Sequence, residues 1–201
     1  MAPRKVVLLG DYGVGKTSFG LRLAKDEFKE TTMATLGVAH FKCRVATSVL
    51  ASAVELEVWD TAGQERYRSL DVLRLYLRRA VGAVVVVDVT VGGSFEAAKH
   101  LISQLRGDED CAAHPDLAIA IALNKCDLVK RDVSEAAIAE FASAQRCSWL
   151  YTSCKTGEGV QDLAKALVGA LPADEKAAPS SGAVGLTMPG AESSLLAPDC
   201  C

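Results

Sequence analysis

The sequence predicts an α/β fold in which a mostly parallel sheet is covered by helices on both faces. Short apolar runs alternate with amphipathic stretches of helical length along most of the chain. That alternation is typical of strand–helix–strand units. Two of the apolar runs, 81–88 and 117–124, are rich in Val, Ile and Ala and show no polar alternation. Strands that are buried on both faces have this composition.

The first half of the chain supplies three strands and one helix. An apolar run at 5–10 ends in glycine and is followed by a helical pattern at 16–26. Two further strands are predicted at 41–49 and 54–59, joined by a turn of small, polar residues near 51–52.

The second half continues the alternation around the two buried strands. Helices are predicted at 94–106, 134–146 and 159–171, and a short strand at 149–152. Ser134 fits the preference for an N-cap, although the Glu of a capping box is missing three residues later. In open sheets of this class ligands bind beyond the carboxyl ends of the strands, so motifs that follow strands are the candidate sites.

Composition changes at Pro172, which predicts a folded domain over 1–171 and a flexible tail over 172–201. The tail holds four of the six prolines, three glycines and four serines. It also holds four acidic residues and one basic residue, whereas the domain holds 21 of each. A neutral domain lacks the basic surface that nucleic acid requires, so we expect no nucleic-acid partner.

The cysteines and the apolar runs limit the cellular setting. The seven cysteines are odd in number, none has the spacing of a metal pair, and the chain opens on a strand rather than a signal peptide. We therefore expect reduced thiols in the cytosol. The longest apolar runs are about seven residues, and a membrane span needs ~20. Membrane contact would have to come from an attached anchor.

Residues 10–17 read G-D-Y-G-V-G-K-T and match the pattern G-x-x-x-x-G-K-[ST] between a predicted strand and a predicted helix. The N–H groups of such a loop and of the helix N-terminus bind phosphate. Lys16 is expected to reach the β- and γ-phosphates and Thr17 to bind Mg²⁺. The residues expected to contact the phosphates are Gly13, Val14, Gly15, Lys16, Thr17 and Ser18. The alternative is a glycine-rich turn with an exposed lysine, and the motif alone also fits ATPases and kinases.

A second motif, N-K-C-D at 124–127, follows the buried strand 117–123 and predicts a base site. The carboxylate of Asp127 can accept hydrogen bonds from both N1–H and N2–H of guanine, which adenine does not offer as a pair. Asn124 can brace the loop and meet the base edge, while Lys125 can lay its methylene stem across the ring. Taken alone, this motif is more often an ordinary polar loop.

Two other segments fit the same base site. Ser153, Cys154 and Lys155 follow the strand at 149–152 and can cover the base from the other side. Phe28, twelve residues after Lys16, can stack on the edge of the ring, although a single phenylalanine is more often part of the core.

Residues that sense a γ-phosphate are predicted after the second hairpin strand and upstream of the first. Asp60 is placed as a carboxylate for Mg²⁺, and Thr35 can bind Mg²⁺ and the γ-phosphate together. The N–H of Gly63 can contact the γ-phosphate, and Gln64 can orient the attacking water. Threonine is common in loops, so Thr35 alone is a weak signal.

With these motifs in this order, residues 5–171 resemble the small GTPases of the Ras superfamily, and the Rab family most closely. The segments that resemble Rab proteins are W-D-T-A-G-Q-E-R-Y-R-S at 59–69, V-D-V-T at 87–90, N-K-C-D-L at 124–128 and the terminal Cys200 and Cys201. The resemblance implies a small G-domain of the P-loop NTPase class, with a six-stranded, mostly parallel sheet and helices on both faces. It also implies a switch that binds GTP or GDP with Mg²⁺, hydrolyses GTP slowly without an activating protein, and regulates vesicle traffic.

The resemblance further implies partners and a membrane anchor. Expected partners are a guanine-nucleotide exchange factor, a GTPase-activating protein, effectors, a Rab escort protein and a GDP-dissociation inhibitor. Phe41, Trp59 and Tyr76 are candidates for the family's aromatic effector patch, with core packing as the alternative for each.

The C-terminus resembles the double-cysteine ending at which Rab proteins are geranylgeranylated. One lipid chain binds a membrane only marginally, and no polybasic stretch precedes Cys200 and Cys201, so a second lipid would supply the second signal. This predicts a lipid-anchored protein on the cytoplasmic face of an intracellular membrane, with a cytosolic pool. A free acidic tail with exposed thiols is the alternative.

The chain departs from the family pattern at several positions. Tyr12 stands where a small residue is usual, which suggests a second possible function, a nucleotide-dependent scaffold with impaired hydrolysis. Cys154 replaces the usual alanine, but its backbone N–H can still meet the base, so we expect little effect. Segments 46–53, 71–79 and 107–114 look lengthened.

Overall fold

The computed structural model describes residues 2–30, 38–46, 53–61, 70–107 and 117–172, and these ranges contain six strands and five helices. In chain order the elements are β1 (Arg4–Leu9), α1 (Lys16–Lys25), β2 (Val38–Val45), β3 (Val54–Thr61), α2 (Leu70–Leu77), β4 (Gly82–Asp88), α3 (Gly92–Gly107), β5 (Ala118–Asn124), α4 (Glu135–Ala144), β6 (Ser148–Tyr151) and α5 (Val160–Ala170).

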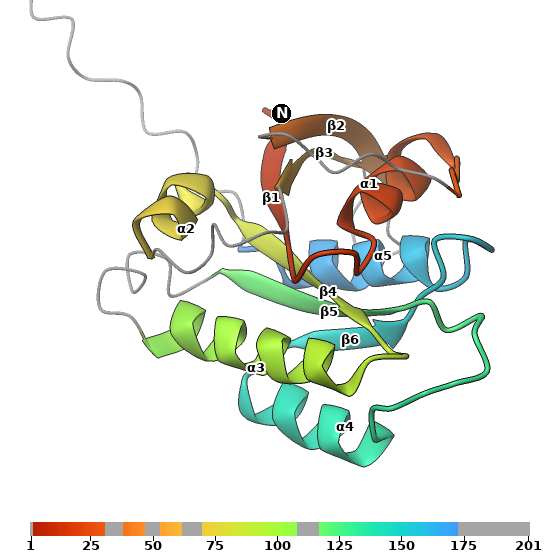
Figure 1. Ribbon diagram of the computed structural model, residues 1–201. Coiled ribbons are helices and arrows are strands. Elements are labelled where there is room, and N and C mark those ends of the chain that lie inside the picture. The colour runs from red at the N-terminus through yellow and green to blue at the C-terminus, as the bar shows by residue number, and fades with distance from the viewer. Residues whose placement is uncertain (1, 31–37, 47–52, 62–69, 108–116, 173–201) are drawn as a thin grey trace, which may run out of the picture.

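The strands form one twisted sheet with the order β2-β3-β1-β4-β5-β6 (Figure 1). β2 pairs antiparallel with β3, and every other neighbouring pair is parallel. Helices α1 and α5 cover one face, while α2, α3 and α4 pack on the other. The predicted α/β class and the mostly parallel six-stranded sheet are confirmed.

Side-chain size along β5 explains how the two faces are packed. Ala118, Ala120 and Ala122 point to the face that α1 and α5 cover, and the larger Ile119 and Ile121 point to the face of α3 and α4. Small side chains let a helix approach the sheet closely, whereas β-branched side chains fill a wider gap. The uninterrupted apolar run at 117–124 therefore places small side chains in one core and larger side chains in the other.

Strand pairing moves several boundaries from their predicted positions. β2 begins at Val38 rather than 41, because its antiparallel ladder with β3 extends from the pair Val38 and Thr61. β3 likewise runs two residues beyond the prediction, to Thr61. α3 starts two residues earlier than predicted, at Gly92. Ser134 is the N-cap residue of α4, but its side chain makes no capping hydrogen bond.

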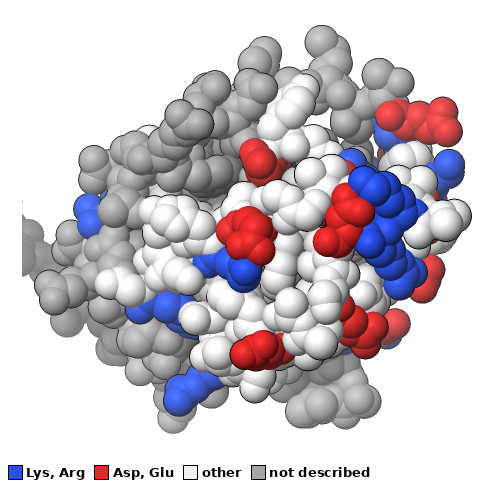
Figure 2. All heavy atoms as spheres, turned by 60° about the horizontal axis from the view of Figure 1, so that its bottom comes forward, with Lys and Arg blue, Asp and Glu red and all other residues white. Residues whose placement is uncertain are grey.

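The carboxyl ends of the parallel strands lie along one edge, and the chain turns there into the loops that form the candidate site. β1 is the switch point of the sheet, since β3 lies on one side of it and β4 on the other. None of the helices within the described residues is long and apolar enough to cross a membrane. On the face around α3 and α4, acidic and basic side chains are interspersed (Figure 2).

Candidate functional site

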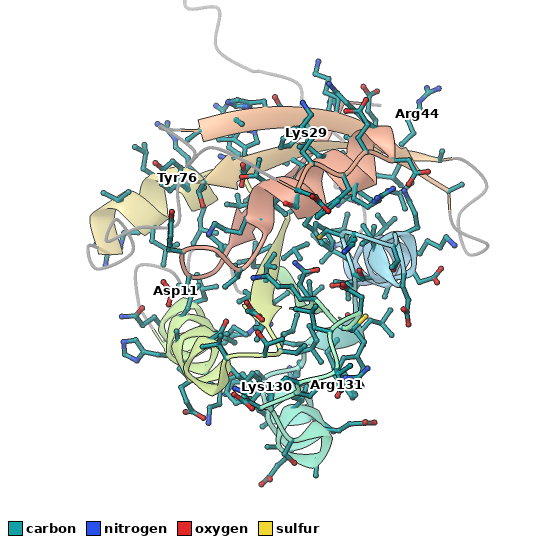
Figure 3. The ribbon with its side chains drawn as sticks, turned by 45° about the vertical axis from the view of Figure 1, so that its right-hand side comes forward. Asp11, Lys29, Arg44, Tyr76, Lys130 and Arg131 are labelled. Carbon is teal, nitrogen blue, oxygen red and sulfur yellow. The ribbon has the colours of Figure 1, made fainter. Side chains whose placement is uncertain are left out.

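Four segments at the carboxyl ends of strands converge on one pocket of about 350 Å³. Three of these segments are the loops after β1, β5 and β6, the fourth is the end of β3 at Thr61, and a segment after α1 completes the wall. The lining residues are Tyr12, Gly13, Gly15, Lys16, Thr17, Ser18, Phe28, Lys29, Glu30, Thr61, Asn124, Lys125, Asp127, Leu128, Cys154 and Lys155. The volume lies in the range of small-molecule and cofactor sites. In Figure 3, Asp11 marks the loop after β1, and Lys130 and Arg131 mark the loop that leads to α4.

The loop after β1 is shaped by glycines that no other residue can replace without strain. Gly10 has φ 135°, and a Cβ on it would lie 2.4 Å from the carbonyl oxygen of Val86. Gly15 has φ 99°, and a Cβ there would lie 2.5 Å from Nδ2 of Asn124. Both conformations are disfavoured for residues with a side chain. The loop can therefore lie directly against β4 and the end of β5.

Lys16 is the first residue of α1, and its side chain folds back over the loop. Its Nζ donates to the carbonyl oxygens of Gly10 at 3.0 Å and Asp11 at 2.6 Å. Burial lowers the pKa of Lys16 to about 8, against the opposing effect of Asp60 and Asp11. A buried ammonium group is stabilised by an anion in contact with it, so the position suits a phosphate.

Thr17 and Asp60 bring two oxygen donors together beside Lys16. The hydroxyl of Thr17 donates to Oδ2 of Asp60 at 2.7 Å, and Asp60 is fully buried. A hydroxyl and a carboxylate are the oxygen ligands that Mg²⁺ accepts, usually completed by water and substrate phosphates. The described residues contain no cluster of three or more His, Cys, Asp or Glu. This pair therefore fits the Mg²⁺ that the sequence predicts.

Asp127 faces the opposite end of the pocket and is held by the loop after β6. Ser153 donates its hydroxyl hydrogen to Oδ1 of Asp127 at 2.6 Å, and the same hydroxyl oxygen accepts from the N–H of Thr156 at 3.1 Å. Ser153 itself is fully buried. The carboxylate that the sequence selects as the base-reading group is thus fixed in orientation.

Asn124 links the two ends of the pocket, as predicted for a bracing residue. Its Nδ2 donates to the carbonyl oxygen of Val14 at 2.9 Å. Its Oδ1 accepts from the backbone N–H of Cys154 and from the Cys154 thiol, each at 3.2 Å. The N–H of Cys154, which the sequence suggests for contact with the base, is therefore engaged by Asn124.

Asp88, at the end of β4, does not line the pocket but holds a residue that does, and none of the nucleotide motifs includes it. Lys125 has φ 65°, and its Nζ donates to Gly13 at 2.9 Å and to Oδ2 of Asp88 at 2.5 Å. Burial opposes ionisation of Asp88, but hydrogen bonds from Lys125 and Thr90 outweigh it and lower the pKa. In the sequence, its only signal is an aspartate at the carboxyl end of a buried strand, within V-D-V-T at 87–90.

The remaining predicted residues divide between the pocket and the undescribed ranges. Phe28 and Lys155 line the pocket, and Tyr12 lies at its rim with 59% of its surface exposed. Thr35, Gly63, Gln64, Cys200 and Cys201 lie outside the described residues. Lys29 and Glu30 line the pocket although no motif pointed to them.

Two of the three candidates for an aromatic surface patch are packed instead. Phe41 lies against Gly20 of α1, where a Cβ would come within 2.6 Å of its ring, and Tyr76 is only 9% exposed. Trp59 is half-buried; Nζ of Lys5 lies 3.7 Å from its ring centroid, and the ring of His40 packs edge-on at 4.3 Å. Because side chains alternate along β2, His40 rather than Phe41 shares a face with Trp59.

Comparison with known proteins agrees with this geometry. The model of the Ras family matches residues 5–172. The chain is 36% identical to the Ras-related protein RABF2a of Arabidopsis thaliana, over 98% of this chain and 94% of that protein. It is 40% identical to the GTP-binding protein ypt5 of Schizosaccharomyces pombe, over 90% of this chain and 83% of that protein. It is 35% identical to the Ras-related protein Rab5A of rice, with coverage of 98% and 94%.

These relatives favour a GTPase over the two alternatives, a scaffold with impaired hydrolysis and an ATP-using enzyme. The family match and the relatives both cover the folded domain that carries the pocket. The chain therefore belongs to the Ras family and is a Rab-type small GTPase, an enzyme that hydrolyses GTP to GDP.

Proposed function

We propose that this chain cycles between GTP-bound and GDP-bound states on an intracellular membrane and thereby regulates vesicle traffic. The nucleotide assignment rests mainly on one observation: a single pocket holds the glycine loop after β1 at one end and Asp127 at the other. Asn124 joins the two ends through Val14 and Cys154. A ligand with a triphosphate and a purine bearing paired hydrogen donors matches both ends.

The phosphate end holds the triphosphate and its metal ion. Backbone N–H groups of 13–18 bind the β- and γ-phosphates, and Lys16 turns from its carbonyl contacts to the phosphate oxygens. Thr17, Asp60 and Thr35 hold Mg²⁺. When bound, the ion neutralises charge on the β- and γ-phosphates.

Hydrolysis is an in-line attack of water on the γ-phosphorus. Gln64 orients the water, while Lys16 and the N–H of Gly63 stabilise charge on the transferred phosphoryl group. We assign no arginine of this chain to the γ-phosphate. Turnover is therefore expected to be slow until an activating protein supplies one.

The base end selects guanine. Asp127 accepts hydrogen bonds from N1–H and N2–H, Lys125 and Phe28 border the ring plane, and the Ser153–Lys155 loop covers it. Lys125 is kept in place by Asp88 and Gly13. An adenine base would leave the carboxylate of Asp127 without hydrogen-bond donors. The free-energy cost of an unpaired carboxylate exceeds the net contribution of a single hydrogen bond.

The cellular assignments follow from family membership and from the tail. Geranylgeranyl groups on Cys200 and Cys201 hold the protein on the cytoplasmic face of a membrane. An escort protein presents the chain for lipidation, and a GDP-dissociation inhibitor keeps a cytosolic pool. An exchange factor, an activating protein and effectors act on the two nucleotide states.

The test of the nucleotide assignment is the substitution Asp127→Asn. An amide cannot accept from both guanine donors, but its NH₂ can donate to the C2 oxygen of xanthine. GDP affinity should fall by at least about 100-fold, while XDP affinity rises. The measurement is calorimetry with GDP, XDP and ADP in Mg²⁺ buffer.

The matched control is Asp162→Asn, which neutralises an exposed carboxylate on α5 that pairs with Lys165. It should bind GDP like the wild type. Equal affinity of the wild-type protein for GDP and ADP would refute the assignment.

A further inference from the structure

Arg22 on α1 lies outside the nucleotide motifs but makes two hydrogen bonds to the base-covering loop, which is residues 153–155 after β6. Its Nε donates to the carbonyl oxygen of Cys154 at 2.8 Å, and its Nη2 donates to that of Lys155 at 2.9 Å. Its Nη1 donates to the carbonyl oxygen of Asp26 at 2.8 Å and to Oδ1 of Asp26 at 2.9 Å. The side chain is only 13% exposed.

These contacts fasten the base-covering loop to the helix that starts in the phosphate loop. α1 begins at Lys16, so the helix that carries Arg22 also carries the residue proposed to reach the phosphates. The loop that Arg22 holds contains Ser153, which fixes Asp127. One side chain therefore connects the helix of the phosphate end to the loop of the base end.

A second link closes the connection into a ring. Val14 accepts from Nδ2 of Asn124, and Oδ1 of Asn124 accepts from the N–H and the thiol of Cys154. Cys154 then contacts Arg22 through its carbonyl oxygen. From Arg22 the backbone runs back along α1 and through its N-cap, Gly15, to Val14, where this series of contacts began.

We propose that Arg22 is a positioning residue that sets the spacing between the phosphate end and the base end of the nucleotide pocket, and so limits GDP release. The inference rests on the proposed assignment of the base site to Asp127 and the 153–155 loop. A nucleotide spans both ends of the pocket. If the base-covering loop is already held at the correct spacing, less conformational entropy is lost when the nucleotide binds. When the loop is released, the nucleotide loses this advantage and dissociates faster.

Arginine is the residue type that this role requires. Its planar guanidinium offers five donors in a fixed fork, so it can reach two successive carbonyls and the end of its own helix together. Lysine carries a compact charge without that fork. The ion pair with Asp26 is a minor part of the arrangement, because the Asp26 side chain is 86% exposed and such pairs are weak.

The experiment compares Arg22→Ala, Arg22→Lys and Asp26→Asn in the full chain with Mg²⁺. Dissociation of fluorescent GDP should be about tenfold faster or more for Arg22→Ala, as expected for the loss of two charge-assisted hydrogen bonds, and intermediate for Arg22→Lys. Asp26→Asn keeps the contacts to both loop carbonyls, so its rate should stay within about twofold of wild type. If Arg22→Ala does not fold, Arg22→Lys carries the test.

A second readout separates positioning from general loss of stability. IDP lacks the 2-amino group of GDP, so the ratio of IDP to GDP dissociation rates reports how well Asp127 is placed. That ratio should fall in the Arg22 variants, because Ser153 no longer holds the Asp127 carboxylate in position for the 2-amino group. General destabilisation would instead raise both dissociation rates equally and leave the ratio unchanged.

The possible failures are distinguishable. A wild-type protein that does not discriminate GDP from IDP or ADP would contradict the proposed base site itself. Wild-type discrimination combined with unchanged rates and an unchanged ratio in the Arg22 variants would overturn only the role of Arg22. Acceleration by Asp26→Asn equal to that by Arg22→Ala would assign the effect to the end of α1 and would also overturn the proposal.

Discussion

Asp88 illustrates how single residues outside the nucleotide motifs position those inside them. It lies at the carboxyl end of β4, where Lys125 donates to one of its carboxylate oxygens and Thr90 to the other. Lys125 would otherwise be a long side chain with several rotamers. The carboxylate fixes it against Gly13, and with it one wall of the proposed base site.

Replacing Asp88 with asparagine should lower the free energy of unfolding by ~1–2 kcal/mol at neutral pH, because the Lys125 ammonium loses its charged partner. The effect is modest because Lys125 is 35% exposed, so that solvent screens the ion pair. The matched control is Asp132→Asn, whose partner Lys130 is 71% exposed, and it should change stability by less than ~0.5 kcal/mol. Urea unfolding of both variants measures the difference.

The same pair gives a pH dependence with a definite sign. The pKa of Asp88 in the folded protein lies below its ordinary value of 3.8. As the pH falls through that range, the unfolded chain takes up a proton first, so the contribution of Asp88 is present above about pH 4 and is lost on further acidification. The stability gap between wild type and Asp88→Asn should therefore narrow from pH 6 to pH 3. A gap that widens would contradict the assignment.

At the scale of secondary-structure elements, the contact between α1 and β2 depends on a glycine inside a helix. Gly20 lies at mid-helix, a position where glycine costs roughly 1 kcal/mol relative to alanine. A Cβ at that position would lie 2.6 Å from the ring of Phe41. The absence of a side chain lets β2 lie close to α1, and this packing partly buries Phe41.

Gly20→Ala should therefore lower the melting temperature although alanine is the better helix former. Overpacking of a core costs ~1–3 kcal/mol, which exceeds the helix-propensity gain. Adding Phe41→Leu should recover part of the loss. Gly169→Ala in α5 is the control, since a Cβ there meets no atom within 4 Å, and it should stabilise by up to ~1 kcal/mol. Equal stabilisation by both alanines in thermal unfolding would disprove the close contact.

At the scale of the whole molecule, the described chain ends on the side opposite the nucleotide pocket. Arg4, at the start of β1, donates through Nη2 to the carbonyl oxygen of Pro172. The pocket lies instead at the carboxyl ends of the strands. If the tail is anchored to a membrane by its last residues, it leaves the domain on the side away from the pocket, which would keep the nucleotide accessible to regulators.

Replacing both Cys200 and Cys201 with serine should leave the protein in the soluble fraction of cell lysates. Each single variant should show partial, reversible membrane binding, since one lipid chain gives only marginal affinity. Fractionation of cells that express each form measures this, and GDP binding by the double variant serves as the control for folding. Continued sedimentation of the double variant with membranes would rule out lipid anchoring at these cysteines.

The local motifs were predictable because each one is chemistry carried by adjacent residues. Glycine spacing around Lys16 predicts a phosphate loop, Asp127 predicts base recognition, and the apolar runs predict buried strands. These signals depend on backbone freedom, charge and periodicity, which are properties of short segments. The fold class followed from the order of such segments.

Contacts between distant segments were not predictable in this way. The pairings of Arg22 with Cys154, of Lys125 with Asp88 and of Phe41 with Gly20 join residues that are far apart in the chain. The register of β2 also decided that His40 rather than Phe41 shares a face with Trp59. By itself the sequence determined which chemical groups this protein brings to a nucleotide. Only the tertiary structure decided what holds those groups at the required spacing, because hydrogen-bond partners and packing gaps are created when the strands and helices come together.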